Sequence, residues 1–262
     1  MTTRRTVLKG GLAALGGLSA TSALTGALTG AARAQGMGGD AHDTAGGGGL
    51  TVHPVQHASF VMVTPGGVVY ADPVGGAGLY EDLPPPDLVL LTHEHGDHYD
   101  VATLEGIVGE GTRLVTNPAV HAMLPGALKE RATAIGNGDS TEALGMPITA
   151  IPAHNLTEER LKYHPKGRDN GYVLDVDGSL VYVSGDTEAV PEMRALNGID
   201  LAFVCMNLPY TMAVAQAAEG VLDFAPKVVY PYHYRDSDPE AFATLVREGN
   251  EAIEVRQGPW YG

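Results

Sequence analysis

Short apolar runs, each closed by turn-forming or polar residues, recur along most of the chain. Residues 50–55 and 59–63 have the composition and spacing of strands, and a Thr-Pro-Gly-Gly turn at 64–67 leads into a third run at 68–71. The third run ends at Asp72. The pattern predicts a β-meander that ends at a polar residue.

Beyond the meander, strand-like runs alternate with helix-like stretches. Strands are expected at 88–92, 113–116, within 141–151, and at 171–176, 179–183, 201–205 and 227–230. Helices are expected at 101–108, 119–129, 191–196, 212–224 and 239–248. Asp177-Gly178 separates two of the strands, and this dipeptide favours a type I′ turn, so residues 171–183 are expected to form a hairpin.

The order of these elements predicts an α/β (α+β) protein, a four-layer αββα sandwich with two sheets face to face and helices outside. The polar residues singled out below lie just past strands, so a site is expected along the edge where strand ends meet. No internal repeat is visible in the sequence. The two halves of the sandwich are therefore expected to be related in architecture only.

The run at 88–92 is apolar except at its last position, and it leads directly into His93-Glu94-His95-Gly96-Asp97-His98. A strand without alternation is typical of one that is buried on both faces. Three imidazoles and a carboxylate this close together do not suit one helix face, but they suit a tight loop in which Gly96 relieves the backbone. The stretch predicts a metal site at the C-terminal end of a strand.

The motif H-x-H-x-D-H resembles that of the metallo-β-lactamase superfamily. Three later segments match the remaining motifs of that superfamily in order: Pro-Ala-His154-Asn, Ser-Gly-Asp186-Thr and Pro-Tyr-His233-Tyr. With Asp72, all five signature positions are present, and the resemblance covers roughly residues 50–257. The runs Tyr-His-Pro-Lys-Gly at 163–167 and Tyr-Pro-Tyr-His-Tyr at 230–234 look like the branch that includes ascorbate-phosphate lactonase.

The resemblance implies two divalent metal ions. It assigns His93, His95 and His154 to one ion and Asp97, His98 and His233 to the other, with Asp186 between them. It also implies that Asp72 accepts a hydrogen bond from the motif loop or from a ligand histidine. Imidazoles and carboxylates suit Zn²⁺, Mn²⁺ or Fe²⁺, and no cysteine lies near any motif. Zn²⁺ is the expected metal.

Two neighbouring cations lower the pKa of a bridging water, so that hydroxide is available near neutral pH, and they polarise a carbonyl or phosphoryl oxygen. We therefore expect a dinuclear hydrolase of a small ester, lactone or phosphodiester, with Asp97 and Asp186 as its catalytic carboxylates. Residues 163–168 are expected to form part of the pocket rim. Substrate contacts are expected among residues that flank strand ends near the motifs: His57, His164, Lys166, Arg168, Asn207 and Tyr210.

Other functions on the same fold are open. A redox metalloprotein similar to a persulfide dioxygenase would contain iron, and a non-catalytic metal-binding protein of the cell envelope would leave the complete ligand set unused. A true β-lactamase is less favoured, because Asp186 as a bridging carboxylate resembles the esterase and phosphodiesterase branches. Metal analysis would distinguish these functions best.

The N-terminal region predicts export. Arg4-Arg5, a mildly apolar stretch and Ala32-Arg33-Ala34 have the order of a twin-arginine signal peptide over residues 1–34, and glycines dilute the stretch too much for a membrane anchor. A periplasmic or extracellular location is expected. Residues 35–49, with four consecutive glycines, predict a flexible linker in which His42 is solvated, and residues 50–262 form the hydrolase domain.

The charge of the chain argues against nucleic acid as a partner. Removal of residues 1–34 takes away four basic residues and no acidic one, so the formal net charge falls from −15 to −19. A surface of this sign repels phosphate backbones, which favours a small-molecule substrate. The single cysteine, Cys205, lies in an apolar run and is expected to be a small buried side chain, so no intramolecular disulfide is possible.

Overall fold

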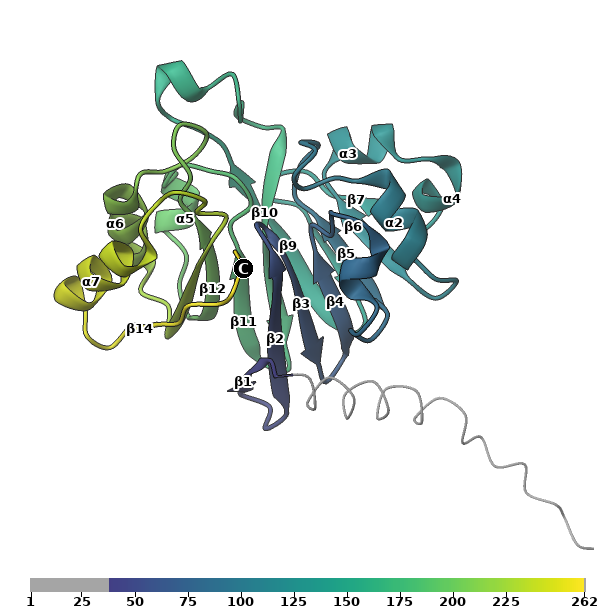
Figure 1. The fold of residues 1–262 in the computed structure, drawn as a ribbon, viewed down its shortest axis with the longest axis horizontal. Helices are drawn as coiled ribbons and strands as arrows, with labels where there is room; N and C mark the ends of the chain where they lie inside the picture. Colours follow the sequence, from purple (N-terminus) through teal and green to yellow (C-terminus); the bar gives the residue numbers. More distant parts are fainter. Residues whose placement is uncertain (1–37, 262) are drawn as a thin grey trace, which may run out of the picture.

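Two seven-stranded β-sheets lie face to face, and helices cover their outer sides (Figure 1). This computed structural model describes residues 38–261, so the predicted signal peptide lies outside the described residues. The four-layer αββα sandwich predicted from the order of the elements is confirmed. No helix within residues 38–261 combines the length and the apolar character needed to cross a membrane.

The first sheet contains strands β1 to β7 in chain order. Their bounds are β1 Asp40–Asp43, β2 Gly49–Gln56, β3 Ser59–Thr64, β4 Gly67–Ala71, β5 Leu88–Leu91, β6 Arg113–Thr116 and β7 Ala132–Ala134. Strands β1 to β4 pair antiparallel, and β4 to β7 pair parallel. The helical elements of this half are η1 Ala77–Tyr80, α2 Val101–Ile107, α3 Pro118–Met123 and α4 Gly126–Lys129.

The second sheet repeats this plan with strands β8 to β14. Their bounds are β8 Ser140–Ala143, β9 Met146–Ala153, β10 Asp169–Val176, β11 Ser179–Val183, β12 Ile199–Cys205, β13 Val228–Tyr232 and β14 Glu254–Val255. Strands β8 to β11 pair antiparallel, and β11 to β14 pair parallel. The helical elements are η2 Glu158–Arg160, α5 Pro191–Arg194, α6 Val214–Phe224 and α7 Pro239–Gly249. The two halves therefore share one architecture.

Local chemistry explains several of these elements. Strand β5 is fully buried, as its unbroken apolar run predicted. Helix α2 begins where the Asp100 side chain accepts a hydrogen bond from the amide of Ala102. In the hairpin of β10 and β11, Asp177 and Gly178 both have positive φ, at 51° and 79°, as a type I′ turn requires.

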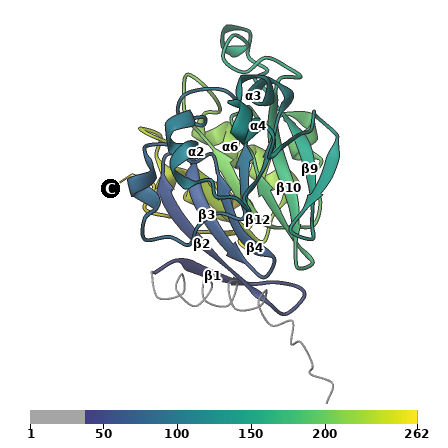
Figure 2. The same cartoon turned by 90° about the vertical axis from the view of Figure 1, so that its right-hand side faces the viewer.

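Two predictions about secondary structure are wrong. Residues 40–43 are not part of a flexible linker: they form β1, which pairs with β2 and crosses the base of the first sheet (Figure 2). His42 is accordingly half-buried, and its ring lies 3.0 Å from the Tyr230 hydroxyl. The helix expected at 119–129 is instead two short helices, because Pro125 has no amide hydrogen to continue the first one.

The core lies between the sheets. Phe60 of the first sheet stacks on Phe203 of the second, with ring centroids 4.0 Å apart. Cys205 is buried there, as predicted, and burial raises the pKa of its thiol to about 12. Such a thiol remains protonated near neutral pH, which fits a packing role.

Candidate metal centre

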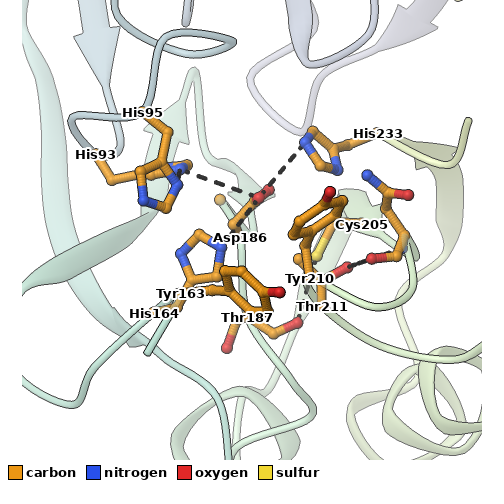
Figure 3. A network of polar contacts seen from close by, with 12 residues as sticks. His93, His95, Tyr163, His164, Asp186, Thr187, Cys205, Tyr210, Thr211 and His233 are labelled. Atoms are coloured by element: carbon orange, nitrogen blue, oxygen red, sulfur yellow. Dashed lines mark hydrogen bonds and ion pairs between the residues drawn. The ribbon is translucent and has the colours of Figure 1, made fainter. Parts of the chain in front are cut away.

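Parallel strands bring the polar motifs to one edge of the sandwich. The His93–His98 motif follows β5, Asp186 follows β11, and His233 follows β13. Because the C-terminal ends of these strands meet at one edge of the sandwich, residues far apart in the sequence lie side by side (Figure 3). The motif residues therefore gather at the edge where the ends of these strands meet.

One group of side chains consists of His93, His95 and His164. His93 Nε2 lies 3.1 Å from His95 Nδ1, and the ring centroid of His164 lies 4.9 Å from that of His93. His93 and His164 are buried, and His95 is partly exposed. Three ring nitrogens converge on a small space, as ligands of a single ion do.

A second group consists of Asp97, His98 and His233, with His57 beside it. His233 Nε2 lies 3.5 Å from Asp97 Oδ2, and His57 Nε2 lies 3.1 Å from the same oxygen. The rings of His57 and His233 are in contact, with centroids 3.9 Å apart.

Asp186 lies between the two groups. One of its oxygens is 3.4 Å from both His164 Nε2 and His233 Nε2, and the other is 3.4 Å from His98 Nε2. Gly185 permits this position: its φ is +59°, and a Cβ atom there would meet the Asn170 carbonyl oxygen at 2.7 Å. A single carboxylate therefore contacts the histidines of both groups.

Hydrogen bonds from outside the groups hold the histidines in place. Asp72, predicted for this role, accepts from Thr92 N at 2.8 Å, and its other oxygen lies 2.7 Å from His98 Nδ1. Asp169 lies 3.0 Å from His164 Nδ1 and also accepts from the Arg168 guanidinium. Each contact leaves the Nε2 atom of the histidine facing Asp186, which is how protein partners orient metal ligands.

The charges of the site are strongly coupled. Burial alone would lower the pKa of His98, but the carboxylates of Asp186 and Asp72 outweigh it and raise that pKa to about 9. Burial also acts to lower the pKa of His164, but the hydrogen bonds to Asp169 and Asp186 outweigh it and raise that pKa to about 9. Burial instead lowers the pKa of His93 well below its ordinary value.

The donor atoms fit a metal ion. Among residues 38–261, several buried polar atoms of the site have no hydrogen-bond partner: His98 Nε2, His233 Nε2 and Asp186 Oδ1. Burying such atoms without a partner costs about 1–3 kcal/mol each, so they are expected to have one. All of them face the space between the imidazoles, where a cation would satisfy them together.

The structure does not bring His154, predicted as a ligand, into either group of converging side chains. His154 is buried, but it belongs to none of the groups whose donor atoms converge, and its Nδ1 has no partner among the described residues. The ring that completes the first group is His164, which the sequence suggested only as a substrate contact. Asn155 N donates to His164 O at 2.9 Å, so residues 155–163 form an excursion whose two ends meet.

A buried carboxylate closes this excursion. Glu188 has no exposed surface, and it accepts hydrogen bonds from the amides of Leu156 and Thr157 at 2.5 and 2.6 Å. Its other oxygen binds the Arg160 guanidinium. The excursion, which includes η2, protrudes from the top edge of the sandwich in both views (Figure 1 and Figure 2). It places His164 where the motif pattern suggested His154.

A cavity of about 330 Å³ opens above the groups. Its lining residues are His95, Asp97, Tyr163, His164, Asp186, Asn207, Tyr210, His233 and Arg235. Asn207 and Tyr210 line this cavity, whereas Lys166 is exposed and does not. Of the predicted rim segment 163–168, Tyr163 and His164 face the cavity.

Sequence reasoning missed Arg235 and Asp169. Arg235 lies two residues after His233, and its guanidinium makes no ion pair with any residue in the described part of the chain. Asp169 is the partner of His164. The available signal was a carboxylate five positions after His164, because a metal-ligating histidine usually donates its second ring N–H to such a partner.

Strained backbone concentrates at this edge. His57, Asp72, His233 and Arg235 all have φ between +41° and +49°, in the left-handed region. Residues other than glycine pay about 1 kcal/mol for this conformation. The strain is maintained by contacts such as the hydrogen bond from His233 N to His57 O at 3.0 Å, so the fold aims these side chains at the site.

Comparison with known proteins gives one consistent result. The family model described as "Beta-lactamase superfamily domain" matches residues 51–233. A UPF0173 metal-dependent hydrolase from Thermococcus onnurineus is 34% identical over 186 residues, which are 66% of this chain and 80% of that protein. A similar hydrolase from Methanopyrus kandleri is 31% identical, over 76% of this chain and 92% of its own.

Among solved structures, a chain from Parabacteroides distasonis named as a metal-dependent hydrolase superposes with a TM-score of 0.76 at 36% identity. The match covers 86% of this chain and 99% of that one. The fold described above is therefore shared with that protein.

Proposed function

Because this chain belongs to the β-lactamase superfamily and is a metal-dependent hydrolase, we propose that it cleaves a small ester, lactone or phosphodiester using two divalent metal ions. The observation that carries the proposal is the position of Asp186, whose carboxylate lies 3.4 Å from imidazole nitrogens of both groups. One carboxylate with contacts on both sides suits a pair of cations.

The residues that would hold the first ion are His93, His95 and His164, and those for the second are Asp97, His98 and His233. Nitrogen and oxygen donors without a thiolate support Zn²⁺, with Mn²⁺ or Fe²⁺ as the alternatives. When bound, such a pair would lower the pKa of a water molecule and polarise the oxygen of the scissile group.

The side chains of this protein prepare the site for that chemistry. Asp186 offsets part of the positive charge that the imidazoles and cations bring together. Asp72 and Asp169 fix which ring nitrogen of His98 and His164 faces inward. These contacts exist before a substrate arrives, so little reorganisation is needed during the reaction.

Binding of the substrate falls to the cavity lining. Tyr163 and Tyr210 pack edge to face, with centroids 5.0 Å apart, and form an aromatic wall. Asn207 and the Arg235 guanidinium offer hydrogen-bond donors from other loops. A cavity of about 330 Å³ holds a small molecule, and the net charge of −15 opposes nucleic acid.

The proposal is tested by metal analysis of the purified protein, followed by a screen of lactones, carboxylic esters, phosphodiesters and cephalosporins. We expect two equivalents of divalent metal and turnover of an ester, lactone or phosphodiester that chelation abolishes and Zn²⁺ restores. A single iron per chain would contradict the dinuclear hydrolase and favour redox chemistry. Salt-sensitive cleavage of RNA or DNA would contradict the small-molecule assignment.

A further inference from the structure

The segment from Gly258 to Tyr261 packs against the second group of site residues. Trp260 is only 1% exposed, and its ring makes edge contacts with Phe60 and Tyr232 at centroid distances of 5.9 and 5.8 Å. Its carbonyl oxygen accepts a hydrogen bond from His57 N at 3.2 Å. This anchored indole fixes the position of the next residue, Tyr261.

The Tyr261 hydroxyl touches two residues of the site. It accepts a hydrogen bond from the backbone N–H of Arg235 at 3.0 Å, and it lies 2.6 Å from His57 Nδ1. The other ring nitrogen of His57, Nε2, lies 3.1 Å from Asp97 Oδ2. A chain of contacts therefore runs from Tyr261 through His57 to a carboxylate of the second group.

The donors and acceptors in this series of contacts, from Tyr261 through His57 to Asp97, have one consistent arrangement. An ionised carboxylate only accepts, so the ring hydrogen of a neutral His57 must lie on Nε2 and point at Asp97. The Nδ1 atom is then an acceptor, and the Tyr261 hydroxyl must donate to it. The contact with the Arg235 amide is compatible, since the phenolic oxygen keeps its lone pairs for it.

His57 could instead be a metal ligand, since its Nε2 lies near Asp97, His98 and His233. The hydrogen-bond pattern argues against this. Both ring nitrogens of His57 have partners within the chain, whereas the Nε2 atoms of His98 and His233 are buried without one among residues 38–261. Of the three histidines of this group, His57 is the one whose two ring nitrogens both have hydrogen-bond partners among the described residues.

Asp97 is the carboxylate that most needs this support. Its side chain is 41% exposed, whereas that of Asp186 is 4% exposed. An exposed carboxylate on a loop is free to rotate, and each alternative rotamer removes an oxygen from the second group. The contact from His57 restrains Oδ2, the same oxygen that lies 3.5 Å from His233 Nε2.

We propose that Tyr261 is a positioning residue: its hydroxyl holds His57 with Nε2–H turned to Asp97, and thereby sets the carboxylate of Asp97 for the second metal ion. The inference rests on the proposed function only in assuming that the second group binds a metal. Partners of this kind typically change metal affinity about 10- to 100-fold. The first group does not touch Tyr261 and should be unaffected.

The test compares Tyr261→Phe with Tyr234→Phe in the full chain. Tyr234 is a neighbour whose ring packs on Tyr261 at 4.7 Å and whose hydroxyl has no hydrogen bond within the described residues, so it is a matched control. In competition with a chelator, metal-free Tyr261→Phe should bind its second equivalent of Zn²⁺ at least about ten-fold more weakly than the wild type does. It should bind its first equivalent as tightly as the wild type. Tyr234→Phe should bind as the wild type does.

Two further measurements separate positioning from other roles. The ¹⁵N shifts of the His57 ring should show hydrogen on Nε2 in the wild type. His57→Gln, which retains a donor and an acceptor, should preserve more affinity for the second ion than His57→Ala. Wild-type affinity of Tyr261→Phe for both ions, or a metal-bound Nε2 on His57, would overturn the proposal. Absence of hydrolysis of any substrate would refute the proposed function without changing these binding results.

Discussion

Replacement of His164 by alanine tests which histidine completes the first group of ligands. His164 is 1% exposed, and its Nε2 lies 3.4 Å from Asp186. Loss of a group that merely orients a ligand weakens metal binding about 10- to 100-fold, so loss of the ligand itself should cost about 100-fold or more, or roughly 2.7 kcal/mol of binding free energy.

The fold should survive this change. Asp169, the partner of His164, keeps two contacts with the Arg168 guanidinium at 2.6 and 2.9 Å, so its charge remains compensated. The free energy of unfolding is expected to fall by about 1–3 kcal/mol, the cost of leaving a buried group without its hydrogen-bond partner. Circular dichroism and thermal unfolding of the metal-free variant check this.

His154→Ala is the matched control, because it removes a buried imidazole on the same segment whose Nδ1 has no partner among the described residues. Metal content after purification and competition against a chelator should show one equivalent lost or greatly weakened in His164→Ala and both retained in His154→Ala. The opposite result, with metal lost from His154→Ala and kept by His164→Ala, would refute the assignment and restore the ligand set predicted from the motifs.

Three further predictions concern the bridge, the pH dependence of stability and export. Asp186→Ala should bind one equivalent of metal in place of two and lose hydrolysis while the fold is retained, and metal analysis with circular dichroism checks this; intact activity would exclude a bridging role. Burial, followed by the Arg256 guanidinium, lowers the pKa of His42 from 6.5 to about 4. Because the folded protein favours the neutral ring, the stability that His42 supports is complete above pH 6.5 and is lost as the pH falls towards 4. About 1 kcal/mol should disappear between pH 7 and pH 5, after allowance for partial exposure, and denaturant titrations should show a smaller loss in His42→Gln. Replacement of Arg4 and Arg5 by lysine should leave precursor in the cytoplasm, as fractionation and immunoblotting would show, whereas unchanged export would contradict a twin-arginine signal.

Local sequence determined most of the secondary structure. Unbroken apolar runs identified buried strands such as β5, and Asp177-Gly178 identified the hairpin turn, because each depends on residues adjacent in the chain. The predictions were wrong where a distant partner decides the outcome. Strand β1 is polar, and it is ordered by pairing with β2 and by the contact of His42 with Tyr230.

Spacing within the sequence determined the motif loop of the site, and with it the position of the site at the ends of parallel strands. Residues within His93–His98 are too close together for the fold to separate them. Asp186 and His233 came from the resemblance of their motifs to the metallo-β-lactamase superfamily, and each lies just past a buried parallel strand that ends at that edge.

Only the tertiary structure decided between His154 and His164. Both follow β9 on the same connecting segment, and both are buried. Glu188, more than twenty residues further along the chain, binds the amides of Leu156 and Thr157 in the excursion, and the returning segment brings His164 to the first group. The contact from Tyr261 to His57 spans 204 positions and likewise has no local signal. A pattern along the chain specifies which residues can bind a metal, but the path of a long loop is set by hydrogen bonds to distant elements, and that path decides which residues reach the site.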